Sequence, residues 1–348
     1  MKSVPIAAAL LFFAACRHAA PEASRLRVPM VTDEADAVLA ILEIRSAGGT
    51  PSDSDWQRLF ASEGYRRLKE REASLQRGFD DVSFREFVLS AGLLGRSDAL
   101  RRALGDWTRI DPADAARRAF VYLPATAVIR AKIYPVIKPR TNSFVFEPRT
   151  NPAIFLYLDP DVAPAKLANT VTHELHHIGV ASVCRDEPSD AGPAENVKTA
   201  LAWMGGFAEG RAVLAAAGGP DVPPHASSGA AERAVWERDL AKVAADLPRL
   251  EAFFDALLDG GLPEEERNRQ GMSFISTEEV PQGAYYTVGW LMSSVIEREL
   301  GRKRLVESVC DPAMFLRDYN GAALARGRTA ERPLPLWSEA FLERLAGR

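Results

Sequence analysis

Cysteine and histidine are scarce in this chain of 348 residues, which has three of the first and five of the second. Three cysteines are too few for a small scaffold held by several disulfides, and too few for a zinc module with four cysteine ligands. Basic residues form no long block and the net charge is −4 at pH 7, which argues against a nucleic-acid-binding protein with a broad basic face. Hydrophobic residues make up 47% and charged residues 26%, the balance of a folded globular protein rather than of a disordered chain.

Long uncharged apolar runs are also missing, with one short exception at the N-terminus. Lys2 is followed by an apolar run from Val4 to Ala15, which is typical of a secretory signal and too short to span a membrane permanently. The run ends in Phe13-Ala14-Ala15-Cys16, which resembles the bacterial lipobox, where the cysteine is lipidated and becomes the new N-terminus. We therefore expect residues 1–15 to be a signal peptide and the mature protein to be an exported lipoprotein of the bacterial cell envelope. The alternative is an ordinary cleaved signal without a lipid; in either case the only membrane contact that we expect is through Cys16.

The rest of the chain divides by its hydrophobic period. Residues 17–31 are rich in Pro, Ala and Arg and are predicted to be a tether, and residues 32–122 carry a helical pattern. Asp80-Asp81 and Asp111-Pro112 are predicted helix starts, the first of a helix over 80–93.

A sheet is predicted next, because β-branched and aromatic residues replace the helical period. We expect three short strands at 127–137, 143–147 and 153–158, antiparallel to one another. The segment at 153–158 could add an extended substrate chain to its edge.

Helices return after the sheet. We expect them at 163–182 and 195–217, and further towards the C-terminus at 228–246, 248–259, 284–300, 302–309, 312–325 and 336–346. Pro248 should break or kink the pair at 228–246 and 248–259, and residues 260–283 show no sustained period. The fold class predicted is α+β, mostly α, with one small sheet.

One cluster carries the candidate chemistry. Three of the five histidines stand within Thr172-His173-Glu174-Leu175-His176-His177, so that His173, Glu174 and His177 form an HExxH pattern. Residues four apart lie on one face of a helix, and two imidazoles so placed can both bind one tetrahedral Zn²⁺. Glu174 lies about 100° further round the helix, beside the metal, where it can take a proton from a water molecule. His176 points elsewhere, and substrate contact, support of a ligand or exposure to water all remain open for it.

A catalytic zinc site needs a third protein ligand. The candidate is Glu209, which lies 32 residues after His177 in a segment with Gly205, Gly206, Gly210 and Ala212, whose small side chains permit close helix packing. Glu195 is the rival, but it stands at a predicted helix start, where acidic residues are favoured anyway. Neither His18, in the tether, nor His225, in a loop rich in Pro, Gly and Ser, is well placed.

The HExxH pattern followed by a Glu-Gly-x-Ala segment resembles the gluzincin class of zinc metallopeptidases. More narrowly, the chain is similar to a poorly characterised bacterial family of zinc-dependent peptidases over about residues 120–325. The shared features are His173 to His177, Phe207 to Gly210, and the stretch from Tyr286 to Met292. The resemblance implies a zincin-like catalytic region over 123–348, one Zn²⁺ per chain held by His173, His177 and Glu209, and Glu174 as the catalytic base.

The mechanism expected is hydrolysis of a peptide or protein substrate by a zinc-activated water, with Glu174 as general base. The oxyanion needs a second donor, for which Tyr285 and Tyr286 are the candidates and Tyr286 is the one that we select. The competing interpretation is a zincin-like lipoprotein without activity, which acts as a binding or scaffold module.

Two other features are left open or assigned to structure. Cys184 and Cys310 could form a disulfide in an exported protein, or remain separate buried thiols. The run from Arg66 to Glu72 mixes charges of both signs at helical spacing and is interpreted as a solvated helix face.

Overall fold

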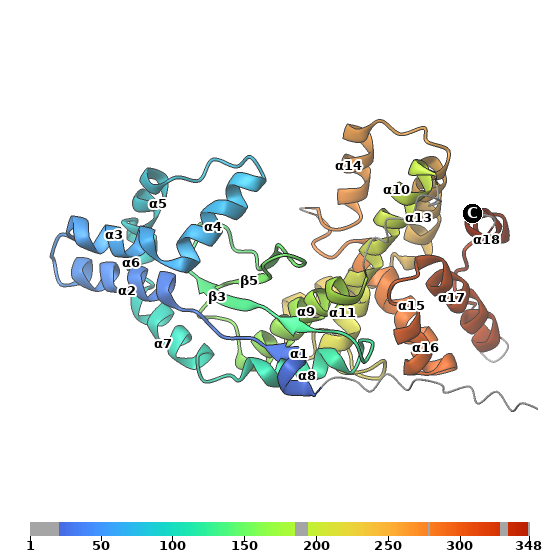
Figure 1. The fold of residues 1–348 in the computed structure, drawn as a ribbon, viewed down its shortest axis with the longest axis horizontal. Helices are drawn as coiled ribbons and strands as arrows, with labels where there is room; N and C mark the ends of the chain where they lie inside the picture. Colours follow the sequence, from blue (N-terminus) through green and yellow to red (C-terminus); the bar gives the residue numbers. More distant parts are fainter. Residues whose placement is uncertain (1–20, 185–193, 278, 328–332, 347–348) are drawn as a thin grey trace, which may run out of the picture.

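The computed structural model describes residues 21–184, 194–277, 279–327 and 333–346. Helices dominate and the strands are few and short, so that the α+β, mostly α class is confirmed (Figure 1). The signal peptide and Cys16 lie outside the described residues. None of the described helices is long and apolar enough to cross a membrane.

The first half of the chain holds eight helices and all the strands among the described residues. The helices are α1 (Glu22–Arg25), α2 (Asp33–Ser46), α3 (Asp53–Ala61), α4 (Glu63–Ser74), α5 (Asp81–Val88), α6 (Ala91–Leu94), α7 (Ser97–Trp107) and α8 (Pro112–Phe120). The strands are β1 (Leu26–Arg27), β2 (Ile129–Arg130), β3 (Lys132–Val136), β4 (Phe144–Phe146) and β5 (Ala153–Tyr157).

The second half is helical throughout its described part. Its elements are α9 (Pro164–Val183), α10 (Glu195–Met204), the 3₁₀ turn η1 (Gly205–Phe207), α11 (Ala208–Ala217), α12 (Ala230–Leu240), α13 (Val243–Leu258), α14 (Glu264–Ser273), α15 (Ala284–Leu300), α16 (Arg302–Glu307), α17 (Pro312–Gly327) and α18 (Glu339–Ala346).

Capping residues set several boundaries as predicted. Asp80 accepts a hydrogen bond from the backbone N–H of Ser83, and Asp111 caps α8, whose first residue is proline. The single helix expected over 80–93 is two, however. Ser90 caps a new helix, α6, by accepting from the backbone N–H of Leu93.

The sheet differs from the prediction in direction. The strand order is β3-β5-β4, with β4 antiparallel to β5 as expected but β3 parallel to it. A period of two identifies a strand and its faces but says nothing about the direction of its partners. Because β5 is paired on both sides, the expectation that residues 153–158 offer a free edge is wrong. The edge lies at β4.

The predicted tether is also wrong for its described part, residues 21–31. β1 pairs in parallel with β2, and Val28 is buried. The backbone N–H of Ile133 donates to the carbonyl of Pro29, and the N–H of Val31 donates to the carbonyl of Ile133. This segment therefore packs along the outer side of β3 and is part of the folded domain instead of a tether.

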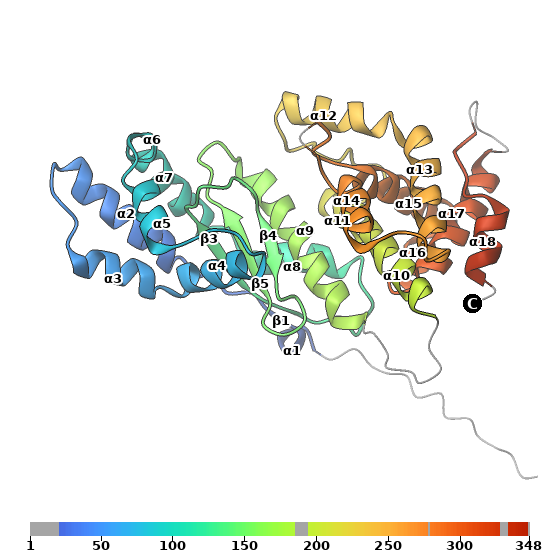
Figure 2. The ribbon, with the colours of Figure 1, turned by 90° about the horizontal axis from the view of Figure 1, so that it is seen from above.

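The core has two principal parts, one on each side of α9. The first joins the N-terminal helices, one face of the sheet and the buried face of α9, and the second joins α10 to α18. Figures 1 and 2 show the N-terminal helices at one end and the C-terminal helices at the other, with α8, α9 and α11 between them. A smaller cluster, which includes Leu68, Tyr134 and Phe155, packs α4 on the opposite face of the sheet.

In the C-terminal half, one helix break was predicted at the wrong place and one helix was missed. Pro248 lies inside α13, and the break falls at residues 241–242, because Leu247, Leu250 and the following aromatic residues anchor α13 in the second core. Residues 260–283 contain α14, which the sequence hid because Gly271 is its only buried residue. Three glutamates in its first turn favour the helix at its positive end.

A disulfide joins Cys184 and Cys310, with their Cα atoms 5.1 Å apart. Of the two alternatives that the sequence left open, the structure has the paired one. The bond ties the C-terminal end of α9 to the segment between α16 and α17, 126 residues later. A loop of that length gives a stabilisation of about 4–5 kcal/mol in the chain-entropy account of disulfides.

Candidate metal centre

Helix α9 presents two different faces. Pro164 is its first residue, and Val171, Leu175 and Ile178 are buried in the first core, which confirms the apolar back face expected from the sequence. His173 and His177 point the other way, towards α11, and their side chains are 16% and 20% exposed. The two imidazoles lie in the middle of α9 and are partly accessible on this face.

Helix α11 supplies the third group. Residues 195–217, predicted as one helix, are split by η1, and Glu209 lies in the first turn of α11. A Cβ at Gly210 would lie 2.1 Å from the backbone nitrogen of Trp290, so that only glycine fits there. The small residues thus serve mainly the contact of α11 with α15, while α11 also packs against α9.

Three ligand atoms converge between the two helices. The Nε2 atoms of His173 and His177 are 3.1 Å apart, and they lie 3.0 and 3.2 Å from Oε2 of Glu209. Zinc bonds of 2.0–2.1 Å in a tetrahedral arrangement place neighbouring ligand atoms about 3.3 Å apart. The spacing of the three atoms therefore fits one zinc ion with a fourth position left over. Among the described residues, no other group of His, Cys, Asp or Glu of this size converges in the same way.

Charge in the cluster also suits a cation. Burial works to raise the pKa of Glu209, but the two histidines outweigh it and the pKa lies well below its usual range. Burial works to lower the pKa of His177, but the Glu209 carboxylate outweighs it and raises that pKa to about 9. Without a metal, the His177–Glu209 pair therefore holds a proton at neutral pH. A Zn²⁺ ion would compete with that proton for the same lone pairs.

Glu174 lies beside the cluster and is not one of its converging groups. Burial raises the pKa of its carboxyl, while His173 and His177 act in the opposite direction. A raised pKa brings a carboxylate closer to the range in which it accepts and returns a proton efficiently.

The two tyrosines at the start of α15 have separate positions. The Tyr286 ring stacks on His173, with ring centres 6.1 Å apart and planes 8° from parallel. The pKa of Tyr286 is raised, first by burial and then by the Glu209 carboxylate, with which its hydroxyl interacts. Tyr285 is fully buried in the second core against Phe207 and Phe274. Of the two candidates, only Tyr286 stands at the cluster.

The remaining candidates lie off the cluster. Glu195 has an 87% exposed side chain that pairs with Lys198. His176 is buried, so exposure to water is excluded for it; burial and the neighbouring histidines hold its pKa well below the usual value. His18 is outside the described residues.

Two residues near the centre escaped the sequence analysis. The ring of His225 packs on Trp236, and its Nε2 lies 3.0 Å from Nε2 of Gln282. Trp236 in turn meets Trp290 edge to face, next to the point where α11 crosses α15. No motif marks Trp236 or Gln282. Only the folded chain brings them into contact with His225, whose pKa is affected by His173.

Comparison with known proteins adds a family. Residues 106–326 match the model of the DUF5700 family, which is described as "putative zinc dependent peptidase". The matched segment contains α9, α11 and α15, and with them the converging ligands and Tyr286. The search of curated proteins and the search of solved structures gave no match.

Proposed function

This chain belongs to the DUF5700 family, and we propose that it is a zinc-dependent peptidase that hydrolyses peptide bonds at the centre formed by α9 and α11. The observation that carries the proposal is the convergence of His173, His177 and Glu209 at distances suited to one tetrahedral zinc ion. A zincin-like fold of the gluzincin type is part of the proposal. It is supported by the order of elements, in which a small sheet precedes the helix with both histidines and a later helix brings the glutamate.

A bound Zn²⁺ would supply a water of lowered pKa and an electrophile for the scissile carbonyl. Glu174 then accepts the proton of the attacking water and passes it to the leaving amine. The Tyr286 hydroxyl donates a hydrogen bond to the oxygen that gains negative charge. The stacking of Tyr286 on His173 holds its ring beside the metal position in readiness for this role.

The direct test is a peptidase assay on the purified protein with its metal content measured in parallel. We expect about one zinc per chain, hydrolysis of a mixture of unstructured peptides, loss of hydrolysis with a chelator, and recovery on adding zinc. A protein that binds zinc but cleaves no peptide would instead favour the inactive binding or scaffold module, which keeps the same ligands.

Export and lipid anchoring are further parts of the proposal. The disulfide between Cys184 and Cys310 supports export, because such bonds persist in oxidising compartments and are rare in the cytosol. In the native bacterial host, mass spectrometry of the N-terminus should show cleavage before Cys16 and added acyl mass. An intact Met1 in the envelope fraction would contradict both the signal and the lipid.

The role of Tyr286 is tested by its replacement with phenylalanine. The variant keeps the ring that stacks on His173 and loses only the hydroxyl, so zinc content and KM should be nearly unchanged. Loss of an oxyanion donor should lower kcat about 10²-fold. Tyr285→Phe is the matched control, since the Tyr285 hydroxyl is buried away from the cluster and has no hydrogen-bond partner in the part of the chain that the structure describes. A kcat for Tyr286→Phe equal to that of Tyr285→Phe would remove Tyr286 from the mechanism.

A further inference from the structure

A second cavity, of about 160 Å³, lies away from the metal centre. It lies between α4, the first turn of α5 with the loop before it, and the segment that follows β3. Its apolar wall consists of Leu68, Phe79, Phe84 and Pro139. Its charged wall consists of Arg77, Lys138, Arg140 and Glu72. Because α4 covers the face of the sheet opposite α9, this cavity shares no residue with the centre described above.

Lys138 is the unusual member of this wall. Its side chain is only 4% exposed, and none of the acidic side chains in the described residues lies within ion-pair distance of its Nζ. Its Nζ donates to two neutral groups, the carbonyl of Arg140 and Oδ1 of Asn142, the second at 2.9 Å. A buried ammonium without a carboxylate partner costs folding free energy, and that cost is reduced when an anion binds beside it.

The neighbouring arginines increase the excess of positive charge around the cavity. Arg71 and Arg77 both approach Glu72, at 2.6 and 3.7 Å, so that one carboxylate serves two guanidinium groups. Arg71 also stacks over the ring of Phe144 at 3.9 Å and is only 13% exposed. The run at 66–72, interpreted from its sequence as a solvated face, is therefore partly buried on the sheet.

Arg140 completes the set at the mouth of the cavity. It is exposed, and none of the described acidic side chains forms an ion pair with it. It lies close enough to Lys138 and Arg71 for its charge to lower the pKa of both. Three cations, Arg77, Lys138 and Arg140, therefore line a hollow whose only acidic lining residue is Glu72, and Arg71 and Arg77 already pair with that carboxylate.

We propose that this cavity binds a small organic anion, a carboxylate that carries a short apolar group. The carboxylate would lie between Arg140, Arg77 and Lys138, where charge-assisted hydrogen bonds are strongest. The apolar group would lie against Phe79 and Phe84, which removes it from water. A volume of 160 Å³ equals that of about five water molecules in the liquid, which limits the ligand to a small molecule or the last residue of a peptide.

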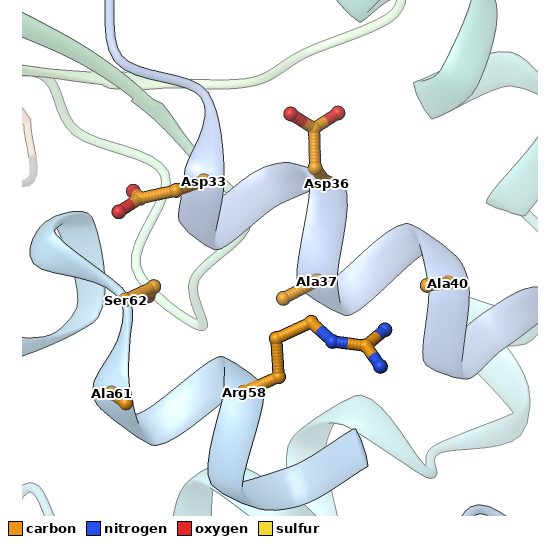
Figure 3. A pocket seen from close by; sticks show the side chains of 7 residues that line it. All are labelled: Asp33, Asp36, Ala37, Ala40, Arg58, Ala61 and Ser62. Carbon is orange, nitrogen blue, oxygen red and sulfur yellow. The ribbon is translucent and has the colours of Figure 1, made fainter. Parts of the chain in front are cut away.

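A larger hollow of about 510 Å³ between α2 and α3 lacks these properties (Figure 3). Asp33 and Asp36 point in different directions there, and Arg58 extends along α2. Asp33 already accepts hydrogen bonds from the backbone N–H groups of Glu63 and Gly64. None of the residues that line this hollow has a buried side-chain polar atom without a hydrogen-bond partner, so the hollow carries no proposal.

Isothermal titration calorimetry of the purified protein tests the basic cavity. The probes are 4-methylpentanoate, its neutral amide and inorganic phosphate, each titrated with and without chelator, because a metal centre also binds carboxylates. We expect the acid to bind in both conditions, at least about tenfold more tightly than the amide or phosphate. The carboxylate could belong to a free organic acid or to the C-terminus of a peptide, and N-acetyl-leucine separates the two. If it binds more tightly than 4-methylpentanoate, the ligand is a peptide end; if it binds more weakly, the ligand is a free acid. Equal binding of acid and amide, or binding abolished by chelator, would overturn the proposal.

Variants locate the binding. Arg140→Gln and Arg77→Gln each remove one partly or fully exposed cation, so the fold should persist. Each should lower the affinity for 4-methylpentanoate by about tenfold. Arg102→Gln, an exposed arginine of α7 outside the cavity, is the matched control. Affinity in both cavity variants equal to that of Arg102→Gln would place the ligand elsewhere and end the proposal. Peptidase activity is no part of the readout, so this result is independent of the function proposed for the metal centre.

Discussion

Replacement of Glu174 with glutamine is expected to lower peptide hydrolysis by about 10²–10⁴-fold, the effect typical of losing a general base. Zinc content should stay at about one per chain, because glutamine keeps the shape of the side chain and Glu174 is not among the converging ligand atoms. Metal analysis and kcat/KM on the same preparation give both quantities.

The matched control is Glu237→Gln, a change of the same kind at an exposed position of α12. Its activity and zinc content should equal those of the parent protein. If Glu174→Gln hydrolyses peptides at the rate of Glu237→Gln, the proton transfer proposed for Glu174 is wrong, even where the metal is bound as expected.

The sequence predicts the local half of this centre well. A spacing of four on a helix already places two imidazoles on one face, and apolar residues at 171, 175 and 178 indicate which face is buried. The structure has both features in α9. No tertiary contact is needed for this part of the prediction.

The distant half depends on packing that has no local signal. Glu209 reaches the histidines because η1 ends one helix and starts another, and because Gly210 lets α11 lie directly on the backbone of α15. The sequence pointed to the small residues as a site of close helix packing but did not identify α15 as their partner. The place of Gly289, opposite Gly210, follows only from the folded chain.

The errors in the fold have similar causes. The direction of β3 depends on how the chain crosses over through β4, which an alternating pattern does not encode. Helix α14 is solvated almost all round, so its period is absent. The charged run at 66–72 lies on aromatic side chains of β4 that are far away in the sequence. For β3 and for the charged run, the local pattern was correct in kind but could not identify the distant partner; for α14, the local pattern itself was absent.

Replacement of a metal ligand should lower zinc binding directly, and activity should fall as a consequence. His177→Ala takes away one of three donors, so bound zinc and activity should be lost together. Glu209→Gln replaces a carboxylate with a neutral amide, which is a poorer ligand. Zinc affinity should fall by more than the roughly 10–100-fold that follows loss of an outer partner of a ligand.

Glu195→Gln is the sharpest control for Glu209, because Glu195 was the rival in the sequence and lies on the helix that precedes η1. Its side chain is 87% exposed and pairs with Lys198, away from the cluster, so zinc affinity should be unchanged in this variant. Competition with a chromophoric chelator measures zinc affinity for all three variants without reference to peptide hydrolysis. If Glu209→Gln retains the affinity of Glu195→Gln, the carboxylate 3.0 and 3.2 Å from the two histidines is not a ligand. The centre would then be a pair of histidines with an acidic neighbour, and the third donor would have to come from another residue or from the substrate.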